Sequence, residues 1–368
     1  MNKLKWIRIK GYRSIKSTEL ELGSLNIFIG PNGAGKSNLV SFFKMLTKMM
    51  ALQLQEYIGT TGQAQSLLHF GSKITPQIES ELAFATDKGT DYYKMRLFHA
   101  ARDTLVFADE AIEFVPTGQT KPRTISLGAG HNETRIREEA TKGEPIARVI
   151  YYLLTQCRVY HFHDTSSTAR MRGYSYINDN RWLMPDAGNL AAMLFAYREK
   201  TNVVYQRIVS AVRTLVAGFD DFCLEPNRLN KNEIMLNWRR RGSDYLFGPH
   251  QISDGSLRAM AICTLLLQPD DDLPNVIILD EPELGLHPYA LEMIARLMRA
   301  ASEKTQIIAA TQSQNFLNFF DPAEIITVVH NGASDFRRLE PDKLADWLED
   351  YSIGELWQRN VLGGGPLP

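Results

Sequence analysis

The chain has 368 residues, of which 44% are hydrophobic, so it can form two or three structural units or one large α/β domain with an insertion. Its 41 lysine and arginine residues nearly balance 42 aspartate and glutamate residues. This balance excludes a protein that is basic as a whole, and any contact with nucleic acid must come from a local surface.

The cysteines and the apolar runs indicate a cytoplasmic protein. Cys157, Cys223 and Cys263 are scattered and lack C-x-x-C spacing, which is typical of reduced, structural cysteines in the cytosol. The chain enters its first strand without the apolar region of a signal peptide, and no apolar run approaches the length that crosses a bilayer. We therefore expect a cytoplasmic location and no membrane-spanning role.

The first elements lead to a glycine-rich loop. Residues 4–9 and 20–25 predict two antiparallel strands joined by a turn at Gly11–Ser14. A buried strand then ends at Ile29, and apolar residues recur at helical spacing over 39–46. Between this strand and helix stands G-x-x-x-x-G-K-S, which holds the phosphates of a nucleotide when it occurs in this context.

The loop supplies candidate ligands for a nucleotide. Its glycines let the backbone wrap closely, so that N–H groups and the start of the following helix point at an anion. Lys36 reaches the β- and γ-phosphates, and the Ser37 hydroxyl faces Mg²⁺. In the preceding turn, Tyr12 or Arg13 either touches the adenine or a phosphate, or serves only as a turn residue and a solvated charge. The candidate binding residues of the loop are Gly30, Pro31, Asn32, Gly33, Ala34, Gly35, Lys36, Ser37 and Asn38.

The middle of the chain predicts a β-layer and a helical unit. Residues 53–71 are polar and contain glycine, so we interpret them as a mobile loop, and residues 116–141 as an exposed, poorly ordered connection. A meander is predicted between these segments, and helices alternate with strands beyond them. The predicted elements are strands 78–84, 92–98 and 104–115, helix 146–153, strand 158–162, helices 190–197 and 203–215, and strand 234–238.

Two clusters in this region leave alternatives open. His161-Phe162-His163-Asp164 has the H-x-H spacing of a metal site, but it is also consistent with a polar strand end near a nucleotide. No second ligand cluster is apparent in the sequence, which favours the strand end. Arg239–Arg241, with Arg170 and Arg172, either contact the phosphates of DNA or belong to a solvated hairpin tip.

The second half supplies the acidic residues that a nucleotide site needs. An apolar strand over 276–279 ends at Asp280 and Glu281. Side chains at the C-terminal ends of parallel strands face the ligand crevice, so Asp280 is placed to complete the Mg²⁺ shell. Glu281 can polarise the attacking water in hydrolysis. A further buried strand over 306–311 ends at Gln312, which either senses the γ-phosphate and orients the water or is only a polar strand terminus.

Another helix start offers free N–H groups to an anion. Ser253-Asp254-Gly255-Ser256-Leu257-Arg258 opens a helix whose buried face continues to Leu267. A strand over 325–329 and a helix over 344–348 follow the strand that ends at Gln312.

Together these motifs resemble the ABC-type ATPases of the SMC, RecF and OLD superfamily, and most closely the stand-alone ATPases of its OLD-like branch. Two residues differ from the common pattern, because Asp254 stands where the commoner signature has glycine, and Gln312 stands where many relatives carry histidine. The resemblance covers nearly the whole chain and rests on Gly11–Ser14, residues 30–37, residues 253–258, Asp280-Glu281-Pro282-Glu283 with Leu286-His287-Pro288, and Thr311-Gln312-Ser313.

The resemblance implies an α/β fold: an ABC-type P-loop ATPase head with a mixed, largely parallel central sheet, an antiparallel β-layer and a helical insertion. Residues 1–50 and 246–368 are then expected to form the two parts of the ATPase core, and residues 51–245 the inserted β-layer and helical subdomain. The resemblance also implies ATP and Mg²⁺ as cofactors. Two subunits would sandwich two ATP molecules, with Ser253 and Gly255 of one subunit contacting the γ-phosphate held by the other.

The implied activity is Mg²⁺-dependent ATP hydrolysis coupled to formation of a homodimer or higher homo-oligomer. Lys36, Glu281 and Gln312 would form the catalytic group, and Ser37 and Asp280 would hold the metal. By the same resemblance, the cycle would switch a separately encoded nuclease or toxin, as in bacterial anti-phage defence. The alternatives are a RecF-like DNA-repair ATPase with direct DNA contact, the nucleotide-binding subunit of a transporter, and a scaffold that binds ATP without turning it over.

Overall fold

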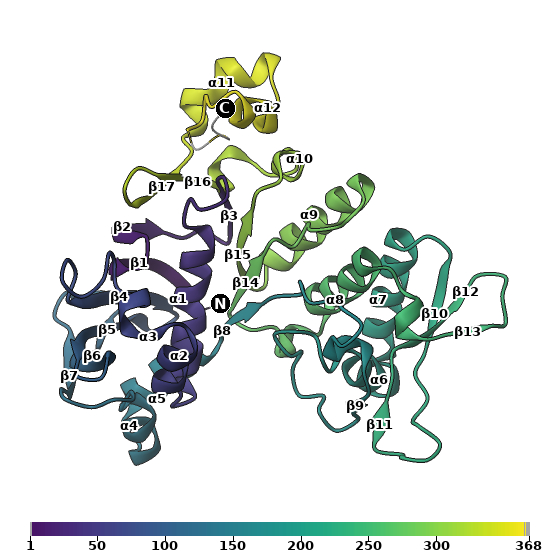
Figure 1. Ribbon diagram of the computed structural model, residues 1–368, viewed down its shortest axis with the longest axis horizontal. Coiled ribbons are helices and arrows are strands. Elements are labelled where there is room, and N and C mark those ends of the chain that lie inside the picture. Colours follow the sequence, from purple (N-terminus) through teal and green to yellow (C-terminus); the bar gives the residue numbers. More distant parts are fainter. Residues whose placement is uncertain (1, 364, 366–368) are drawn as a thin grey trace.

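The computed structural model describes residues 2–363 and 365 and contains two six-stranded sheets and a lobe of helices and short strands (Figure 1). The predicted α/β class, with a mixed central sheet, an antiparallel β-layer and a helical lobe, is confirmed. Helix α1 (Lys36–Met50) packs in the hydrophobic core shared by the two sheets. The lobe packs into a second core on the opposite face of one of them.

The first sheet, here called the nucleotide sheet, has the strand order β17-β16-β3-β15-β14-β8. The neighbours from β16 to β8 are parallel, and β17 is antiparallel to β16. The C-terminal ends of the five parallel strands therefore share one edge of the sheet, where ligands bind in such folds. The strands are β3 (Leu25–Ile29), β8 (Cys157–Tyr160), β14 (Val276–Asp280), β15 (Gln306–Thr311), β16 (Ile325–His330) and β17 (Ser334–Arg338).

The second sheet, here called the β-layer, is antiparallel, with the order β2-β1-β4-β5-β6-β7. The predicted strand pair and the three-stranded meander are confirmed, with longer strands than the apolar patterns indicated. Because β1 pairs with β4, the β-layer combines strands that precede the phosphate loop in the sequence with strands that follow it. The strands are β1 (Lys3–Tyr12), β2 (Ile15–Glu21), β4 (Gln77–Thr86), β5 (Gly89–Ala100), β6 (Thr104–Pro116) and β7 (Arg123–Gly128).

Two segments predicted as loops are ordered, so both predictions were wrong. The first forms α2 (Leu54–Thr60) and α3 (Gln63–Leu67), and the second contains β7 and α4 (Ile136–Lys142). The Glu133 carboxylate accepts hydrogen bonds from the backbone N–H groups of Leu54 and Gln55, at 2.9 and 3.0 Å. It thereby satisfies the free donors at the start of α2. This partner lies 79 residues from Leu54, so no local pattern could indicate it.

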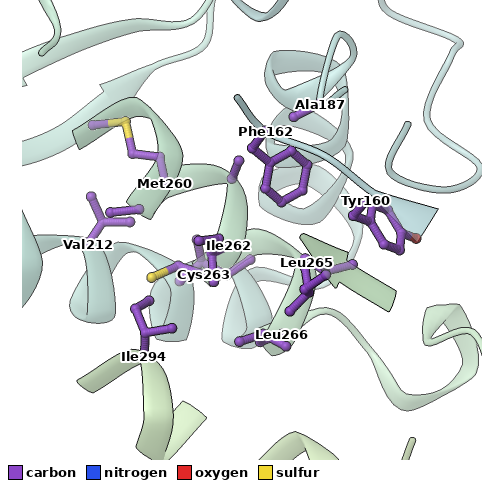
Figure 2. Close-up of a cluster of buried hydrophobic side chains, with 14 of the residues drawn as sticks. Tyr160, Phe162, Ala187, Val212, Met260, Ile262, Cys263, Leu265, Leu266 and Ile294 are labelled. Carbon is purple, nitrogen blue, oxygen red and sulfur yellow. The ribbon is translucent and has the colours of Figure 1, made fainter. Parts of the chain in front are cut away.

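Side chains of each buried strand alternate between two hydrophobic cores. In β14, Val276 and Ile278 pack in the core with α1, while Ile277 and Leu279 pack in the core with the lobe. Figure 2 shows part of the second core, which contains Tyr160 of β8, Phe162 just beyond β8 and helix side chains such as Met260. A parallel strand that is covered on both faces reads as a continuous apolar run, which explains the residues of β14.

Helices cover the nucleotide sheet and form the lobe. The predicted helix before β8 and the predicted helical pair of the lobe are confirmed as α5, α6 and α7. The single predicted strand 234–238 was wrong, because the Asn237 N–H bonds to the Met235 carbonyl at 2.9 Å and the turn separates two short strands. The remaining elements are α5 (Pro145–Thr155), β9 (Ser175–Tyr176), α6 (Leu190–Lys200), α7 (Asn202–Leu215), β10 (Phe219–Cys223), β11 (Glu233–Ile234), β12 (Asn237–Arg240), β13 (Leu246–Phe247), α8 (Asp254–Leu267), α9 (Pro288–Ser302), α10 (Gln314–Leu317), α11 (Pro341–Asp350) and α12 (Ile353–Gln358), with short 3₁₀ turns at Arg170–Arg172, Pro249–Gln251, Asp270–Asp272 and Pro322–Glu324.

Across residues 2–363 and 365, none of the helices combines the length and apolar character required to span a membrane. The three cysteines are free thiols, and burial raises the pKa values of Cys157 and Cys263 to about 12.

Candidate nucleotide site

The phosphate loop leaves β3, enters α1 and is braced from outside by a chain of hydrogen bonds. Gly35 has φ of 114°, and a Cβ there would stand 1.9 Å from Ser334 Oγ, so only glycine fits. Ser334 Oγ donates to the Ala34 carbonyl at 2.6 Å, and Ser14 Oγ lies 2.6 Å from Ser334 Oγ. Asn38 Nδ2 in turn donates to Ser14 Oγ at 2.6 Å. Sequence reasoning missed Ser334, because 300 residues separate it from Ala34.

Lys36 lies in the first turn of α1 and is only 6% exposed. Its Nζ donates to the carbonyls of Gly30 at 2.5 Å and Pro31 at 3.1 Å, inside the loop. Burial lowers the pKa of Lys36, whereas the negative charges of Glu281 and Asp280 favour its charged form. The fold thus places one buried cation near the carboxylates of Asp280, the last residue of β14, and Glu281, which follows it.

Two side chains at the ends of neighbouring strands meet directly. Gln312, just after β15, donates from Nε2 to Oε1 of Glu281 at 2.7 Å. Glu281 has φ of 46°, the left-handed region that non-glycine residues rarely occupy, and its N–H bonds to the Ala310 carbonyl at 2.7 Å. Such backbone outliers concentrate at functional sites because the surrounding structure must hold them in place. The parallel pairing of β14 with β15 therefore joins two of the three predicted catalytic residues.

Glu283 is a residue to which sequence reasoning assigned no role. It is 7% exposed, and its Oε1 accepts hydrogen bonds from the Thr311 hydroxyl and, at 3.4 Å, from the Gln312 N–H. Its Oε2 is buried without a hydrogen-bond partner in the part of the chain that the structure describes. Burial raises the pKa of Glu283 to about 7. The signal that could have found it is its position, since it follows a buried strand by only three residues.

The residues present fit a magnesium-bound nucleoside triphosphate. The loop is a close-fitting cradle at two of its glycines, since a Cβ would stand 2.4 Å from the Val328 carbonyl at Gly30 and 1.9 Å from Ser334 Oγ at Gly35. Its backbone N–H groups and Lys36 offer positive charge to phosphates. Mg²⁺ is usually held by one or two protein oxygen ligands together with phosphate oxygens. Ser37, in the first turn of α1, and Asp280, at the end of β14, offer such oxygens.

The segment predicted to act from a second subunit begins α8. Ser253 is the N-cap of this helix, and its Oγ accepts a hydrogen bond from the Ser256 N–H at 3.3 Å. A Cβ at Gly255 would stand 2.2 Å from the Gly285 carbonyl, so Gly255 lets α8 approach the turn after Glu283 within the same chain. In the described part of the chain, no hydrogen bond joins Ser253 to the phosphate loop.

The turn before the phosphate loop does not offer Tyr12 to a nucleotide. Tyr12 is completely buried, and its hydroxyl lies 3.0 Å from Ser41 Oγ and 3.3 Å from Tyr57 Oη. Burial raises the pKa of Tyr12 well above its usual value. The interpretation that Tyr12 touches a nucleotide was therefore wrong, because Tyr12 is a core residue at the end of β1, beside the turn. Arg13, with φ of 50°, places its guanidinium over the Tyr12 ring at 5.8 Å.

The two histidines after β8 have a structural contact with the site. The rings of His161 and His163 lie 4.0 Å apart between centroids, and His163 Nε2 donates to the Asp280 carbonyl at 2.9 Å. Burial and the neighbouring His163 lower the pKa of His161. Within residues 2–363 and 365, no group of three or more histidine, cysteine or acidic residues is arranged to hold a metal ion. His161 and His163 therefore match the interpretation of a polar strand end beside the site.

The candidate DNA-contacting arginines divide into two sets. Arg172 cannot reach a duplex from its place in the fold because it is buried. Arg170 forms an ion pair with Asp186 at 3.0 Å. Arg239–Arg241, at the end of β12, are all exposed.

Two family models match the chain. A model for an AAA ATPase domain matches residues 2–117, which include the phosphate loop. A model for the AAA domain of a proposed AbiEii toxin, from a type IV toxin–antitoxin system, matches residues 173–318. The second match includes Ser253, Asp280, Glu281 and Gln312. The two models therefore cover the two halves of the site that the nucleotide sheet brings together.

The curated relatives are similar over short stretches. The energy-coupling factor transporter ATP-binding protein EcfA1 of Methanospirillum hungatei is 31% identical over 85 residues, which are 23% of this chain and 29% of that protein. EcfA2 of Staphylococcus aureus (strain MRSA252) is 27% identical over 105 residues, 27% of this chain and 35% of that protein. The alignments span between 12% and 35% of the length of the curated relatives.

Solved structures of SMC heads share the fold over most of the chain. An Smc head bound to the C-terminal winged-helix domain of ScpA has a TM-score of 0.62 at 15% identity, covering 93% of this chain and 99% of that one. An Smc head with an extended coiled coil, derived from Pyrococcus furiosus and bound to the C-terminal domain of ScpA, has a TM-score of 0.60 at 16% identity. It covers 95% of this chain and 99% of its own.

Proposed function

Because this chain belongs to the ABC-type ATPases and has the fold of an SMC head, we propose that two copies close on Mg²⁺-ATP, hydrolyse it, and thereby regulate a separately encoded effector. The observation that carries the hydrolytic part is the Glu281–Gln312 hydrogen bond, 2.7 Å long, in a site that also contains the buried Lys36. A carboxylate and an amide at the ends of parallel strands, with a cation at the start of the helix behind the phosphate loop, are groups that can orient water and stabilise charge in phosphoryl transfer.

The chemistry assigns one task to each group. Lys36 and the loop N–H groups stabilise charge on the phosphate oxygens, and Glu281 orients the attacking water and accepts its proton. Gln312 holds Glu281 through the hydrogen bond described above and lies within reach of the same water. Ser37 and Asp280 would hold Mg²⁺, which neutralises phosphate charge when it is bound.

Dimer formation completes the site in this proposal. The N-terminus of α8 presents backbone N–H groups and the positive end of a helix dipole, and Ser253 at its N-cap is exposed. From a second copy, Ser253 and the segment around Gly255 would contact the γ-phosphate, so that ATP binding favours the dimer and hydrolysis releases it. The same arrangement is compatible with a larger homo-oligomer built from such dimers.

The effector part of the proposal draws on the match to an AAA domain of toxin–antitoxin systems. Such systems pair a toxin with a regulator, so we propose that this ATPase acts in the cytoplasm with a nuclease or toxin subunit in anti-phage defence. Dimer opening and closing would change the surface that the effector binds.

One observation favours a second candidate function, a DNA-binding ATPase of the RecF kind. Arg239–Arg241 form an exposed basic run at the end of β12. Such a run can neutralise several phosphates of DNA, which makes binding strongly dependent on salt.

One experiment separates these candidates. The Glu281→Gln protein is purified from its native cell in ATP and Mg²⁺, and its assembly state and associated molecules are measured by native mass spectrometry and nucleic-acid analysis. A dimer with a stoichiometric nuclease or toxin supports the proposal. DNA alone, lost at raised salt, favours the second candidate, and an integral membrane protein points to a transporter. A monomer in saturating ATP contradicts the dimer mechanism.

A further inference from the structure

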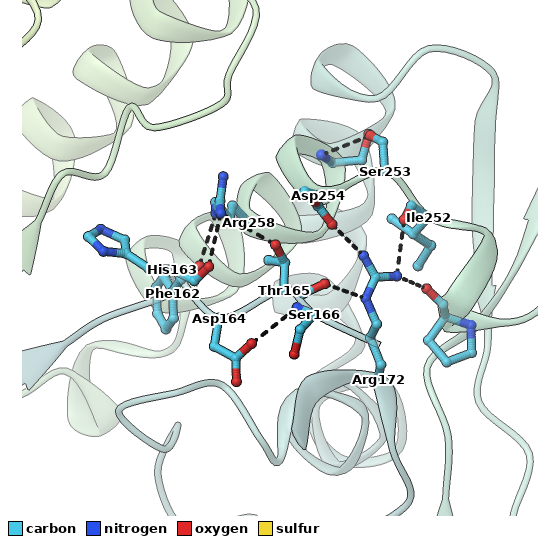
Figure 3. A network of polar contacts seen from close by, with 12 residues as sticks. Phe162, His163, Asp164, Thr165, Ser166, Arg172, Ile252, Ser253, Asp254 and Arg258 are labelled. Atoms are coloured by element: carbon cyan, nitrogen blue, oxygen red, sulfur yellow. Dashed lines mark hydrogen bonds and ion pairs between the residues drawn. The ribbon is translucent and has the colours of Figure 1, made fainter. Parts of the chain in front are cut away.

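One buried arginine joins the segment after β8 to the start of α8. Arg172 is 5% exposed, and its guanidinium donates to the carbonyls of Thr165 at 2.9 Å, Ile252 at 3.1 Å and Pro249. It also donates to Asp254 Oδ1 at 2.7 Å (Figure 3). Three acceptors are neutral and belong to the backbone, so Asp254 is the only charged partner among them.

Asp254 places a negative charge where the proposed mechanism requires an anion to bind. It is the first residue of α8, directly after the N-cap Ser253, and its side chain is 62% exposed. A carboxylate at this position is stabilised by the helix dipole, but it repels a phosphate that approaches the same helix end. The sequence pattern alone does not show what offsets this repulsion of a phosphate.

A second arginine, Arg258 on α8, provides a contrast to Arg172. Arg258 donates to the carbonyls of Phe162 at 3.1 Å and His163 at 2.9 Å, and to Thr165 Oγ1 at 3.3 Å (Figure 3). It also donates to the Leu284 carbonyl at 3.1 Å. All of these acceptors are neutral. Arg258 therefore anchors α8 to the segment after β8, as Arg172 does, but it has no carboxylate partner among these acceptors.

We propose that Arg172 is a positioning residue that neutralises Asp254, so that the helix start carrying Ser253 can receive the γ-phosphate of ATP held by the second subunit. This inference rests on the proposed dimer mechanism. The ion pair keeps the local charge near zero, and the three backbone contacts of Arg172 fix its guanidinium on the side of Asp254.

If Arg172 acts by neutralising Asp254, the strength of ATP-dependent dimerisation should follow the local charge of each variant, which a purely structural role of Arg172 does not predict. Arg172→Gln leaves the Asp254 carboxylate uncompensated and should weaken ATP-dependent dimerisation by about tenfold. Asp254→Asn leaves Arg172 unpaired and should strengthen it by about tenfold. The double variant is neutral again and should return to the unmodified level.

The test uses the full chain with Glu281→Gln as the common background, so that hydrolysis does not empty the site. Sedimentation velocity in saturating Mg²⁺-ATP gives the dimer dissociation constant, and titration with a fluorescent ATP analogue at low protein concentration gives the affinity of the phosphate loop. Raising the salt concentration should reduce the differences between variants, because exposed charges are screened. Arg258→Gln, alone and combined with Asp254→Asn, is the matched control. In this combination the two substitutions should act independently, so Asp254→Asn should strengthen dimerisation by the same factor as it does alone and should not correct a defect caused by Arg258→Gln.

Failure of the inference can be distinguished from failure of the proposed function. If the Glu281→Gln background itself stays monomeric in ATP, the dimer mechanism is wrong and the inference falls with it. If the background dimerises but the double variant remains as weak as Arg172→Gln, neutralisation is wrong. Should Arg172→Gln fail to fold, Asp254→Asn decides alone, because weaker dimerisation in that variant would show that the carboxylate itself is needed.

Discussion

Gln312 Nε2 donates a hydrogen bond to Glu281 Oε1 at 2.7 Å, although 31 residues separate the two in the chain. The contact exists because β14 and β15 are adjacent and parallel, so their final residues stand side by side at one edge of the nucleotide sheet. It assigns Gln312 a physical role that its place in the sequence left open, which is to hold the carboxylate that would orient water.

Glu281→Gln should lower kcat for ATP by about 10²–10⁴-fold while ATP binding is retained, because the amide cannot accept the proton of the attacking water. Phosphate release at saturating ATP measures kcat, and titration with a fluorescent nucleotide measures binding. The variant should also accumulate as a dimer in ATP. Equal turnover of the variant and the unmodified protein would overturn the assignment of Glu281.

Gln312→Ala should lower kcat by roughly tenfold or more and change KM much less, because Gln312 orients Glu281 rather than holding the nucleotide. Steady-state kinetics over a range of ATP concentrations separates the two parameters. Asn315→Ala, which removes an exposed amide from α10 nearby, is the control and should match the unmodified protein. A rise in KM at constant kcat would instead make Gln312 a binding residue.

Gly35→Ala should be far more harmful than Gly33→Ala. Both glycines have positive φ, 114° and 80°, but a Cβ at Gly33 would meet nothing within 4 Å, whereas a Cβ at Gly35 would collide with Ser334 Oγ at 1.9 Å. Gly33→Ala should therefore lose only about 1 kcal/mol of unfolding free energy through backbone strain. Gly35→Ala should lose a further 1–3 kcal/mol or so and disturb the serine pair behind the loop.

Denaturant unfolding and ATP affinity measure this pair of variants. Equal losses would show that the hydrogen bonds through Ser334 do not shape the loop.

Glu283→Gln should remove a pH dependence of stability. Burial raises the folded-state pKa of Glu283 to about 7 from its ordinary value of 4.5. Folding therefore favours the protonated form, and this contribution is complete below about pH 4.5 and lost as the pH rises through about 7. The unfolding free energy of the unmodified protein should fall by about 3 kcal/mol across this interval.

The stability of the glutamine variant should vary less with pH because the amide does not titrate. Glutamine also keeps an oxygen that can accept the Thr311 hydrogen bond, so at alkaline pH the variant should be more stable than the unmodified protein, which then buries a charged carboxylate. Denaturant unfolding at several pH values gives the comparison. Glu303→Gln, at an exposed carboxylate after α9, is the control and should leave the pH dependence unchanged. Parallel pH curves for Glu283→Gln and the unmodified protein would contradict the role assigned to burial.

Much of the architecture could be predicted because its signals are local. The apolar runs of β3, β14 and β15 report strands covered on both faces, and the spacing of apolar residues in α1 reports a helix with one buried side. The two segments wrongly interpreted as loops lack such signals, because partners far along the chain stabilise them. Glu133 caps α2 from 79 residues away, and β7 is a strand because β6 pairs with it.

The amino-acid sequence by itself determined the phosphate loop and the acidic end of β14, because the chemistry of each depends on residues that are consecutive in the chain. Tertiary structure alone decided which distant groups meet. Parallel pairing joined Gln312 to Glu281, folding of the lobe brought Arg172 to Asp254, and burial rather than residue type set the pKa of Glu283. These contacts depend on the relative placement of whole strands and helices, which short-range sequence periodicity does not encode.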